Sequence, residues 1–311
     1  MGSDVTTNTS KVRDALGAAV DALRAAGVED PRLDAEVLLA EAMGCGRAQL
    51  IADPNAGVPA GAGRRFAEMV RRRLRREPVA YILGRKGFRH IELAVDPRVL
   101  IPRPETELLV ELALELRPAT VLDVGTGSGA IALAIADELA ETEVIATDTS
   151  AGALDVARGN AERLGLSERV RFAAGTLPEG PSADLAGSPA VDRAGEAVPE
   201  QGGVDLIVAN LPYIAEADWP SLQPEVTQWE PREALLAGPD GLDAIRAFLA
   251  GCVRTFGRDP IRTANGSSAM ALEVGEGQAE AVAELLGEAG FGEVQARPDL
   301  AGIPRIVWGK R

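Results

Sequence analysis

One stretch of this sequence narrows the possible folds more than any other. An apolar segment of strand length, Thr120–Val124, runs directly into a glycine-rich turn, and a helical pattern begins at Ala130. Glycines allow a tight turn and let a ligand approach the backbone, and the amides at a helix start favour polar or anionic groups. We therefore expect a nucleotide-type ligand at this turn, which consists of Gly125, Thr126, Gly127, Ser128 and Gly129.

Strand-like and helical patterns alternate through the region that follows. Such alternation predicts a doubly wound parallel sheet and therefore an α/β fold. Two last strands, near Glu293–Ala296 and Arg305–Trp308, are joined by a short loop and are expected to pair antiparallel. The other expected strands are Thr120–Val124, Val144–Thr147, Val170–Ala173, Val204–Ala209 and Met270–Val274. The expected helices are Glu105–Leu116, Ala130–Leu139, Ala151–Leu164 and Gln278–Ala289.

The first 80 residues show three helical patterns instead. The first is expected to begin at a Ser10 cap and end at Gly27, and the second to run from Asp30-Pro31 to Gly44. The third follows a loop rich in Pro and Gly, and its arginines form either a solvated face or a partner surface. These arginines are Arg64, Arg65, Arg71, Arg72, Arg73, Arg75 and Arg76. We expect a helical domain over 1–80, a β-hairpin linker over 81–104 and an α/β sheet domain over 105–311.

Charge and composition exclude several classes of function. Residues 1–90 hold 15 basic and 11 acidic side chains, a net +4, whereas the rest holds 17 and 36, a net −19. Such an acidic chain is a poor candidate for non-specific nucleic acid binding. Cys45, Cys252 and His90 are its only cysteines and histidine, which argues against a disulfide framework, a zinc site and most histidine-based catalysis. With no signal or membrane-span pattern, we expect a cytoplasmic protein without a metal.

Asp148 ends the second expected strand, 19 residues after Gly129. A carboxylate at this place would accept hydrogen bonds from a ribose diol, in a dinucleotide site or in an S-adenosyl-L-methionine (SAM) site. The loop from Gly125 to Ala130 also fits the loose dinucleotide fingerprint. A glycine turn without ligand, and an Asp148 that only caps the next helix, are open alternatives.

A second motif discriminates between these possibilities. The strand Val204–Ala209 ends in Asn210-Leu211-Pro212-Tyr213, at the edge of the sheet where ligands bind. The Asn side chain and the next backbone carbonyl would offer two acceptors to one point, which suits an NH2 group, and Tyr213 offers a flat face. The alternative is that Asn210 and Pro212 only shape the turn.

At this motif the sequence resembles SAM-dependent methyltransferases that modify planar NH2 groups. Further motifs, in the same order along roughly residues 10–310, resemble one branch, the peptide chain release factor glutamine N5-methyltransferase family (PrmC/HemK type). These motifs are Glu77–Gly84, Leu100–Glu107, Ala237–Asp243, Glu273–Gln278 and Asp299–Arg305.

This resemblance implies a helical N-terminal domain, a β-hairpin linker and a seven-stranded Rossmann-like SAM domain. It implies methylation of the glutamine in the Gly-Gly-Gln (GGQ) motif of class 1 release factors. Apart from the resemblance, we expect a monomer that binds neither nucleic acid nor membrane. Gly125 to Gly129 would line the amino acid part of SAM, Asp148 its ribose and Leu177 its adenine, with Asn210 also near the cofactor. Asn210, Leu211, Pro212 and Tyr213 would hold the glutamine amide and carry catalysis. Arg71 to Arg76 would contact the release factor.

The sequence departs from the family pattern at two places. Leu211 stands where the family usually has Pro, and Thr176-Leu177 replaces an acidic-aromatic pair near the adenine. The alternatives are an adenine-N6 RNA or DNA methyltransferase, a glutamine methyltransferase of a ribosomal protein, a SAM-fold module without turnover, and an NAD-dependent oxidoreductase. Residues 181–203 and 257–268 are expected to be mobile surface loops.

Overall fold

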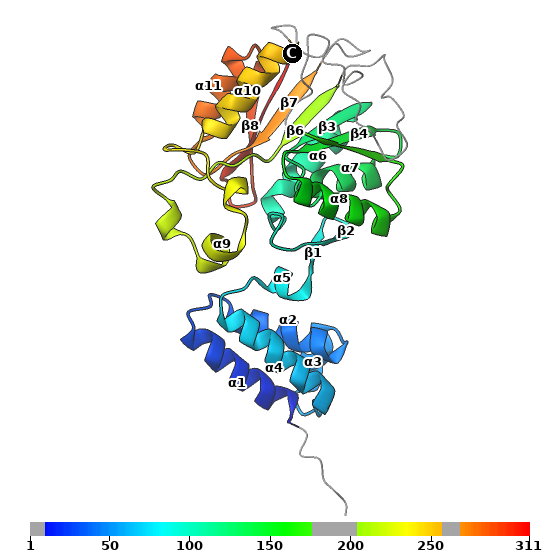
Figure 1. Ribbon diagram of the computed structural model, residues 1–311, viewed down its shortest axis with the longest axis vertical. Coiled ribbons are helices and arrows are strands. Elements are labelled where there is room, and N and C mark those ends of the chain that lie inside the picture. The colour runs from blue at the N-terminus through cyan, green and yellow to red at the C-terminus, as the bar shows by residue number, and fades with distance from the viewer. Residues whose placement is uncertain (1–9, 176–203, 257–267) are drawn as a thin grey trace, which may run out of the picture. The chain divides into compact units, whose positions relative to one another are not determined.

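The computed structural model describes residues 10–175, 204–256 and 268–311 (Figure 1). The chain forms two compact units. The first comprises Met1–Gly84 together with Gln223–Trp229, and the second comprises Arg85–Leu222 and Glu230–Arg311. The short segment Gln223–Trp229 therefore belongs to the helical unit, although it follows the sixth strand in the sequence.

The first unit is helical, as expected. Apolar side chains of α1, α2 and α4, among them Leu23, Leu38 and Phe66, form its core. Proline at the first position starts α2, and Gly44 ends it with φ 65°, a left-handed conformation that glycine adopts readily. Its helices are α1 (Val12–Ala25), α2 (Pro31–Met43), α3 (Arg47–Ala52), α4 (Ala60–Leu74), α5 (Val79–Leu83) and α9 (Pro224–Trp229).

The expected Ser10 cap is wrong. The helix begins after Lys11, and no side chain caps it. The amides of Val12 and Arg13 donate instead to the carbonyl oxygens of Ala56 and Pro54, at 3.0 and 2.9 Å. A distant loop thus satisfies the first helical N–H groups, which a local pattern cannot reveal.

The second unit opens with the expected β-hairpin. Strands β1 (Arg85–Phe88) and β2 (Ile91–Ala94) pair antiparallel. His90 lies in the turn between them, and 71% of its side chain is exposed. The hairpin is followed by the 3-10 turn η1 (Pro104–Thr106) and helix α6 (Glu107–Leu116).

A seven-stranded sheet forms the centre of the second unit. Its order is β5-β4-β3-β6-β7-β9-β8, with β9 antiparallel to both neighbours and the other strands parallel. This confirms the doubly wound α/β fold and its antiparallel ending. The strands are β3 (Thr120–Val124), β4 (Glu143–Asp148), β5 (Val170–Ala174), β6 (Leu206–Ala209), β7 (Ala269–Glu273), β8 (Gly292–Pro298) and β9 (Pro304–Lys310).

Helices cover both faces of this sheet. In Figure 1, α6, α7 (Ala130–Glu138) and α8 (Ala151–Leu164) lie on one side, and α10 (Asp243–Phe256) and α11 (Ala279–Glu288) on the other. Every residue of β6 and β7 is buried, as expected for strands covered on both faces. The short turns η2 (Trp219–Ser221) and η3 (Arg232–Ala234) complete the described elements.

The strand order locates the ligand crevice. Strand β3 lies between β4, its successor in the chain, and β6, so the connections from these strands run in opposite directions. Ligands in such sheets bind beyond the carboxyl ends of the strands at this switch point. Among the described helices, none is long and apolar enough to span a membrane. The expected loops over 181–203 and 257–268 lie outside the described residues except for Ser268, which is buried.

Candidate functional site

The glycine loop lies at the carboxyl end of β3. Gly125, Gly127 and Gly129 have φ values of 74°, 56° and 84°, a region that other residues rarely adopt. A Cβ atom on Gly129 would also lie 2.8 Å from Leu133 Cδ1. The amides of Gly125 and Thr126 both donate to the Thr147 carbonyl at 2.9 Å, which fixes the loop to the end of β4.

Two buried side chains that sequence reasoning missed support this loop. Asp123 Oδ2 accepts from Thr126 Oγ1 at 2.6 Å and from the Ala132 amide at 3.2 Å. Asn160 donates to the Ser128 carbonyl at 2.8 Å. Burial raises the pKa of Asp123 to about 7. A carboxylate inside an otherwise apolar strand was the available signal for Asp123.

Asp148 ends β4 beside the loop, as expected. Its Oδ2 atom accepts from the Gly127 amide at 2.9 Å, and Oδ1 accepts from the Ser150 amide at 2.8 Å. The side chain that caps α8 is Ser150, whose hydroxyl accepts from the Ala153 amide at 3.2 Å. Asp148 therefore orders the glycine loop, and its role toward a ribose stays a prediction.

The structure brings the Asn210 motif next to the glycine loop. Strands β3 and β6 are parallel neighbours in which Val124 pairs with Ala209, so the residues that follow each strand lie side by side. A Cβ atom on Gly125 would lie 3.6 Å from Leu211 Cδ2. Leu211 is buried in the apolar core beside β6, so the side chain that replaces the family's usual Pro fills the core.

The Asn210 amide is oriented by one contact. Its Nδ2 atom donates to Thr106 Oγ1 at 3.1 Å, and Thr106 is buried. Within the described residues, no protein group donates a hydrogen bond to Asn210 Oδ1. The side-chain oxygen is therefore available to accept from a ligand NH2 group.

Two later sequence motifs hold Tyr213. Its carbonyl oxygen accepts from Gln278 Nε2 at 2.9 Å, and Gln278 Oε1 in turn accepts from the Gly275 amide at 2.9 Å. A Cβ atom on Gly241 would lie only 2.3 Å from the Tyr213 oxygen, so only glycine fits there. The Tyr213 hydroxyl donates to Glu273 Oε1 at 3.4 Å, and burial raises the Tyr213 pKa.

Glu230 anchors the segment that carries Thr106. One of its oxygens accepts from the Ile101 amide at 3.0 Å, and the other pairs with the Arg103 guanidinium. Glu230 is only 7% exposed, whereas the Arg103 side chain is 32% exposed, so the pair is buried on the carboxylate side. The motif Leu100–Glu107 is thus fastened at its start, and its end reaches Asn210.

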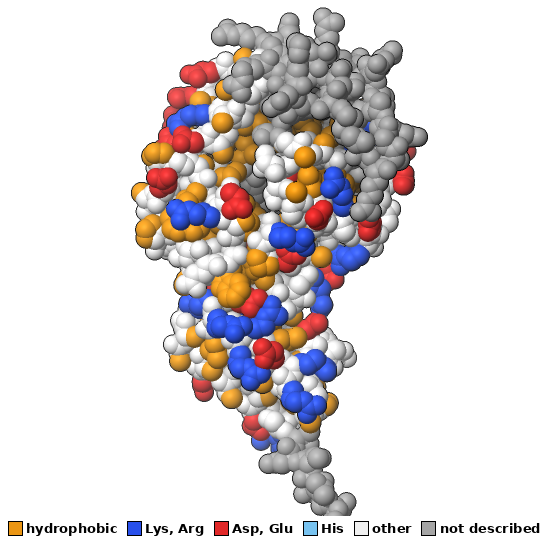
Figure 2. Space-filling model, in the orientation of Figure 1, with side chains coloured by type: hydrophobic (Ala, Val, Ile, Leu, Met, Phe, Trp, Pro, Cys, Tyr) orange, Lys and Arg blue, Asp and Glu red, His pale blue; other side chains and the backbone are white. Residues whose placement is uncertain are grey.

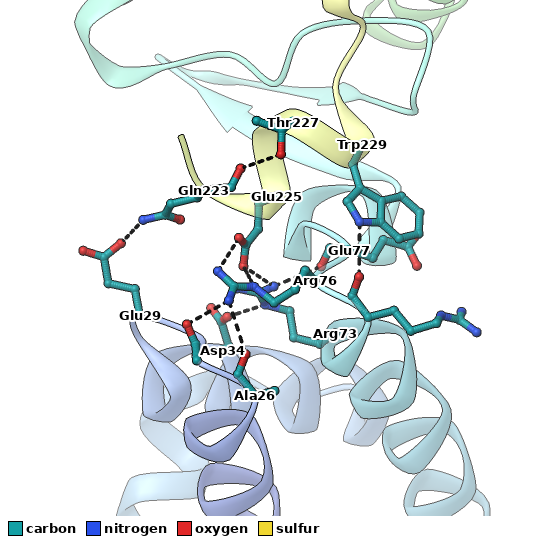
Figure 3. A network of polar contacts seen from close by, with 12 residues as sticks. Ala26, Glu29, Asp34, Arg73, Arg76, Glu77, Gln223, Glu225, Thr227 and Trp229 are labelled. Atoms are coloured by element: carbon teal, nitrogen blue, oxygen red, sulfur yellow. Dashed lines mark hydrogen bonds and ion pairs between the residues drawn. The ribbon is translucent and has the colours of Figure 1, made fainter. Parts of the chain in front are cut away.

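The arginines of α4 do not form one open surface. Arg73 is buried and pairs with Asp34 and Glu225, both at 2.6 Å (Figure 3). Arg76 binds Glu225 through two nitrogens, at 2.7 and 2.6 Å, and Arg72 pairs with Glu77. The expected contact of Arg73 with a protein partner is therefore wrong, because its guanidinium is used inside the helical unit.

Helix α9 contributes Glu225 to the ion pairs with Arg73 and Arg76, and the pKa of this carboxyl is lowered. Burial would raise the pKa of Glu225, but hydrogen bonds from Arg76 and Arg73 hold it below its usual value. Gln223 binds Glu29, and Trp229 Nε1 donates to the Arg75 carbonyl at 3.3 Å (Figure 3). These contacts explain why α9 is part of the helical unit. Thr176 and Leu177, expected near an adenine, lie outside the described residues.

Comparisons with known proteins match nearly the whole chain. The profile of the PrmC N-terminal domain matches residues 14–84, and that of a methyltransferase domain matches 117–219. A release factor glutamine methyltransferase of Bordetella pertussis is 44% identical over 283 residues, which cover 90% of this chain and 94% of that protein. One of Rhodopirellula baltica is 40% identical over 299 residues, 92% of each chain.

Solved structures give the same fold at low identity. The catalytic domain of hMettl16, determined in complex with MAT2A 3′UTR hairpin 6, aligns with a TM-score of 0.50 and 15% identity. The alignment covers 70% of this chain and 75% of that one. At this identity the likeness concerns the fold alone.

Proposed function

The chain belongs to the release factor glutamine methyltransferase family, and from this premise we propose that it methylates the side-chain amide nitrogen (N5) of the GGQ glutamine in class 1 peptide chain release factors. The methyl donor is SAM. The observation that carries the proposal is the Asn210 side chain at the end of β6. Its amide NH2 is engaged by Thr106, and its oxygen is left to accept from a substrate amide beside the glycine loop.

The residues at the switch point fit SAM. The three loop glycines hold a conformation that exposes backbone to a ligand, and a Cβ atom on Gly127 would meet no atom within 4 Å. Gly125 to Gly129 would hold the amino acid part of SAM and Asp148 the ribose, with Asn210 and Leu177 as further contacts. When bound, SAM supplies a methyl group already activated on a sulfonium.

The protein has to position a poor nucleophile. An amide nitrogen is weakly nucleophilic because its lone pair is delocalised into the carbonyl. Asn210 Oδ1 and the Leu211 carbonyl would accept its two N–H bonds, which orients the nitrogen toward the methyl group and stabilises the positive charge that develops there. Pro212 stiffens the turn, and the Tyr213 ring packs against the substrate amide.

Mass spectrometry of a release factor incubated with this chain and labelled SAM tests the proposal. The expected result is one labelled methyl group on the GGQ glutamine. Asn210→Ala should lower kcat about 100- to 1,000-fold, because it removes one of two charge-stabilising acceptors, and should weaken SAM binding much less. Label on adenine or on a ribosomal protein, with none on the release factor, would identify one of the alternative substrates instead.

We also propose that residues 1–80, which make up most of the helical unit, recognise the release factor. On the face drawn in Figure 2, Lys and Arg side chains gather over this unit. Arg64 and Arg71 on α4 are exposed, and so is Arg75, which directly follows this helix. Reversing these three charges should raise KM for the protein substrate and leave SAM affinity unchanged. The rest of the chain is acidic, which disfavours binding to the anionic surfaces of nucleic acids and membranes. The proposed enzyme is a cytoplasmic monomer that acts on protein.

A further inference from the structure

Two buried polar side chains lie behind the Asn210 motif and have no part in the chemistry described so far. Thr106 ends η1 and is 4% exposed, and Glu273 ends β7 and is 2% exposed. Strand β7 is the parallel neighbour of β6, with Leu272 paired to Ala209, so Glu273 lies beside Asn210. Two separate sequence motifs therefore contribute one side chain each to the same buried place.

These side chains form a chain of hydrogen bonds with the acceptor motif. Asn210 Nδ2 donates to Thr106 Oγ1 at 3.1 Å, and the Thr106 hydroxyl lies close enough to Glu273 to lower the pKa of that carboxyl. The Tyr213 hydroxyl donates to Glu273 Oε1 at 3.4 Å. The Glu273 carboxylate thus accepts from the Tyr213 hydroxyl and faces the Thr106 hydroxyl that lies behind Asn210.

The chemistry of the hydroxyl gives this chain a direction. A threonine hydroxyl has a single proton to donate, and a carboxylate can only accept. When Thr106 donates to ionised Glu273, its remaining lone pairs can only accept, and they accept from Asn210 Nδ2. The Asn210 oxygen is then on the other side of the amide. If the Asn210 amide were flipped, its NH2 group would face the NH2 group of the substrate, and no hydrogen bond could form because both groups only donate.

We propose that Thr106 and Glu273 are positioning residues that hold the Asn210 amide with its oxygen toward the substrate nitrogen and fix the Tyr213 ring from behind. The inference rests on the proposed function, since it assigns how the acceptor of that reaction is oriented. Neither side chain touches the reacting atoms, and both act through Asn210 and Tyr213.

The surroundings of Glu273 disfavour its ionised form. Its Oε2 atom is buried without a hydrogen-bond partner among the described residues. The charged or titratable groups that face it are Glu105 from η1, Tyr213 from the acceptor turn and Arg305 from β9. Burial raises its pKa to about 7, with Glu105 adding to the effect while Thr106, Tyr213 and Arg305 oppose it.

Protonation of Glu273 should reverse the chain of hydrogen bonds. A protonated carboxyl can donate to Thr106, which then is able to donate to Asn210 Oδ1 and favour the flipped amide. The ionised form is therefore the competent one, and kcat should fall as pH decreases through about 7. The acid limb should approach a tenfold loss per pH unit.

The decisive experiment compares Thr106→Val, Thr106→Ser and the wild type on a release factor with saturating SAM. Thr106→Val keeps the shape and removes the hydroxyl, so kcat should fall about 10- to 100-fold with KM and SAM Kd nearly unchanged. Thr106→Ser restores the hydroxyl and should restore kcat. The matched control is Thr142→Val, which removes another buried hydroxyl, bound to the Pro118 carbonyl at 2.8 Å at the opposite end of the sheet.

A second variant keeps the inference testable if Thr106→Val folds poorly. Glu273→Gln cannot ionise, so its pH profile should lose the acid limb near pH 7 that the wild type shows. A wild-type kcat in Thr106→Val, or an acid limb that persists in Glu273→Gln, overturns the inference. A wild type that transfers no methyl group to the release factor overturns the proposed function instead, so the two failures are distinct.

Discussion

Replacing Asp123 with Asn should change how the stability of the catalytic unit depends on pH. Asp123 is fully buried on the central strand β3, and its Oδ1 atom has no hydrogen-bond partner among the described residues. Burial raises its pKa from 3.8 to about 7, which the hydrogen bonds from Thr126 and Ala132 only partly oppose. The folded chain therefore binds this proton more tightly than the unfolded chain does.

The size and sign of the effect follow from linkage. The proton stabilises the folded state fully below the unfolded pKa of 3.8, and this contribution is lost as pH rises through about 7. A shift of about 3 pKa units corresponds to about 4 kcal/mol at most. Asn does not titrate, so the stability of Asp123→Asn relative to the wild type should rise by up to this amount from about pH 4 to about pH 8.

Urea unfolding without SAM, measured at a series of pH values, checks this prediction. Asp137→Asn is the matched control, because Asp137 is exposed on α7 and its replacement should leave the pH dependence unchanged. A difference between Asp123→Asn and the wild type that stays flat across this range would falsify the burial argument. A carboxyl NMR titration of the wild type gives the pKa of Asp123 directly.

Two further predictions concern the turn that carries Tyr213 and the network around α9. Gly241→Ala should lower kcat at least about tenfold, because the new Cβ would displace the Tyr213 carbonyl 2.3 Å away. Gly87→Ala, whose Cβ meets no atom within 4 Å, should keep wild-type kcat, and equal rates would contradict the argument. Glu225→Leu should lower the free energy of unfolding of the helical unit by about 3 kcal/mol, because it leaves buried Arg73 with one carboxylate partner fewer. Urea titration measures this loss, and a value below about 1 kcal/mol would show that Asp34 alone neutralises Arg73.

The sequence predicts the fold best where local chemistry determines it. The structure has β3 and α8 at the expected bounds, because glycines or capping residues stand at their ends. Helices α3 and α9, of six residues each, were not expected, since so short a segment has little periodicity. Contacts between residues far apart in the sequence stabilise α9, above all the ion pairs of Arg73 and Arg76 with Glu225.

The candidate site, like the fold, could be predicted from the sequence only in part. The glycine loop and the Asn210 motif can be predicted from the sequence. Each directly follows a strand, and the two strands are parallel neighbours whose carboxyl ends lie together. The side chains that orient the loop and the motif cannot be predicted from the sequence. Thr106 lies 104 positions before Asn210 and Asn160 lies 32 after Ser128, and no local pattern marks either pairing.

The placement of α9 has a consequence for dissecting this chain. The helical unit is discontinuous, since the polypeptide leaves it after Gly84 and returns for Gln223–Trp229 before continuing to Glu230. A fragment ending at Gly84 would keep Arg73 and Arg76 without Glu225, the carboxylate that both of them bind, and a fragment starting at Arg85 would carry Glu225 without its arginines. No single cut therefore separates two self-sufficient pieces, and any graft of a foreign helical module would have to bring its own matching seven-residue segment.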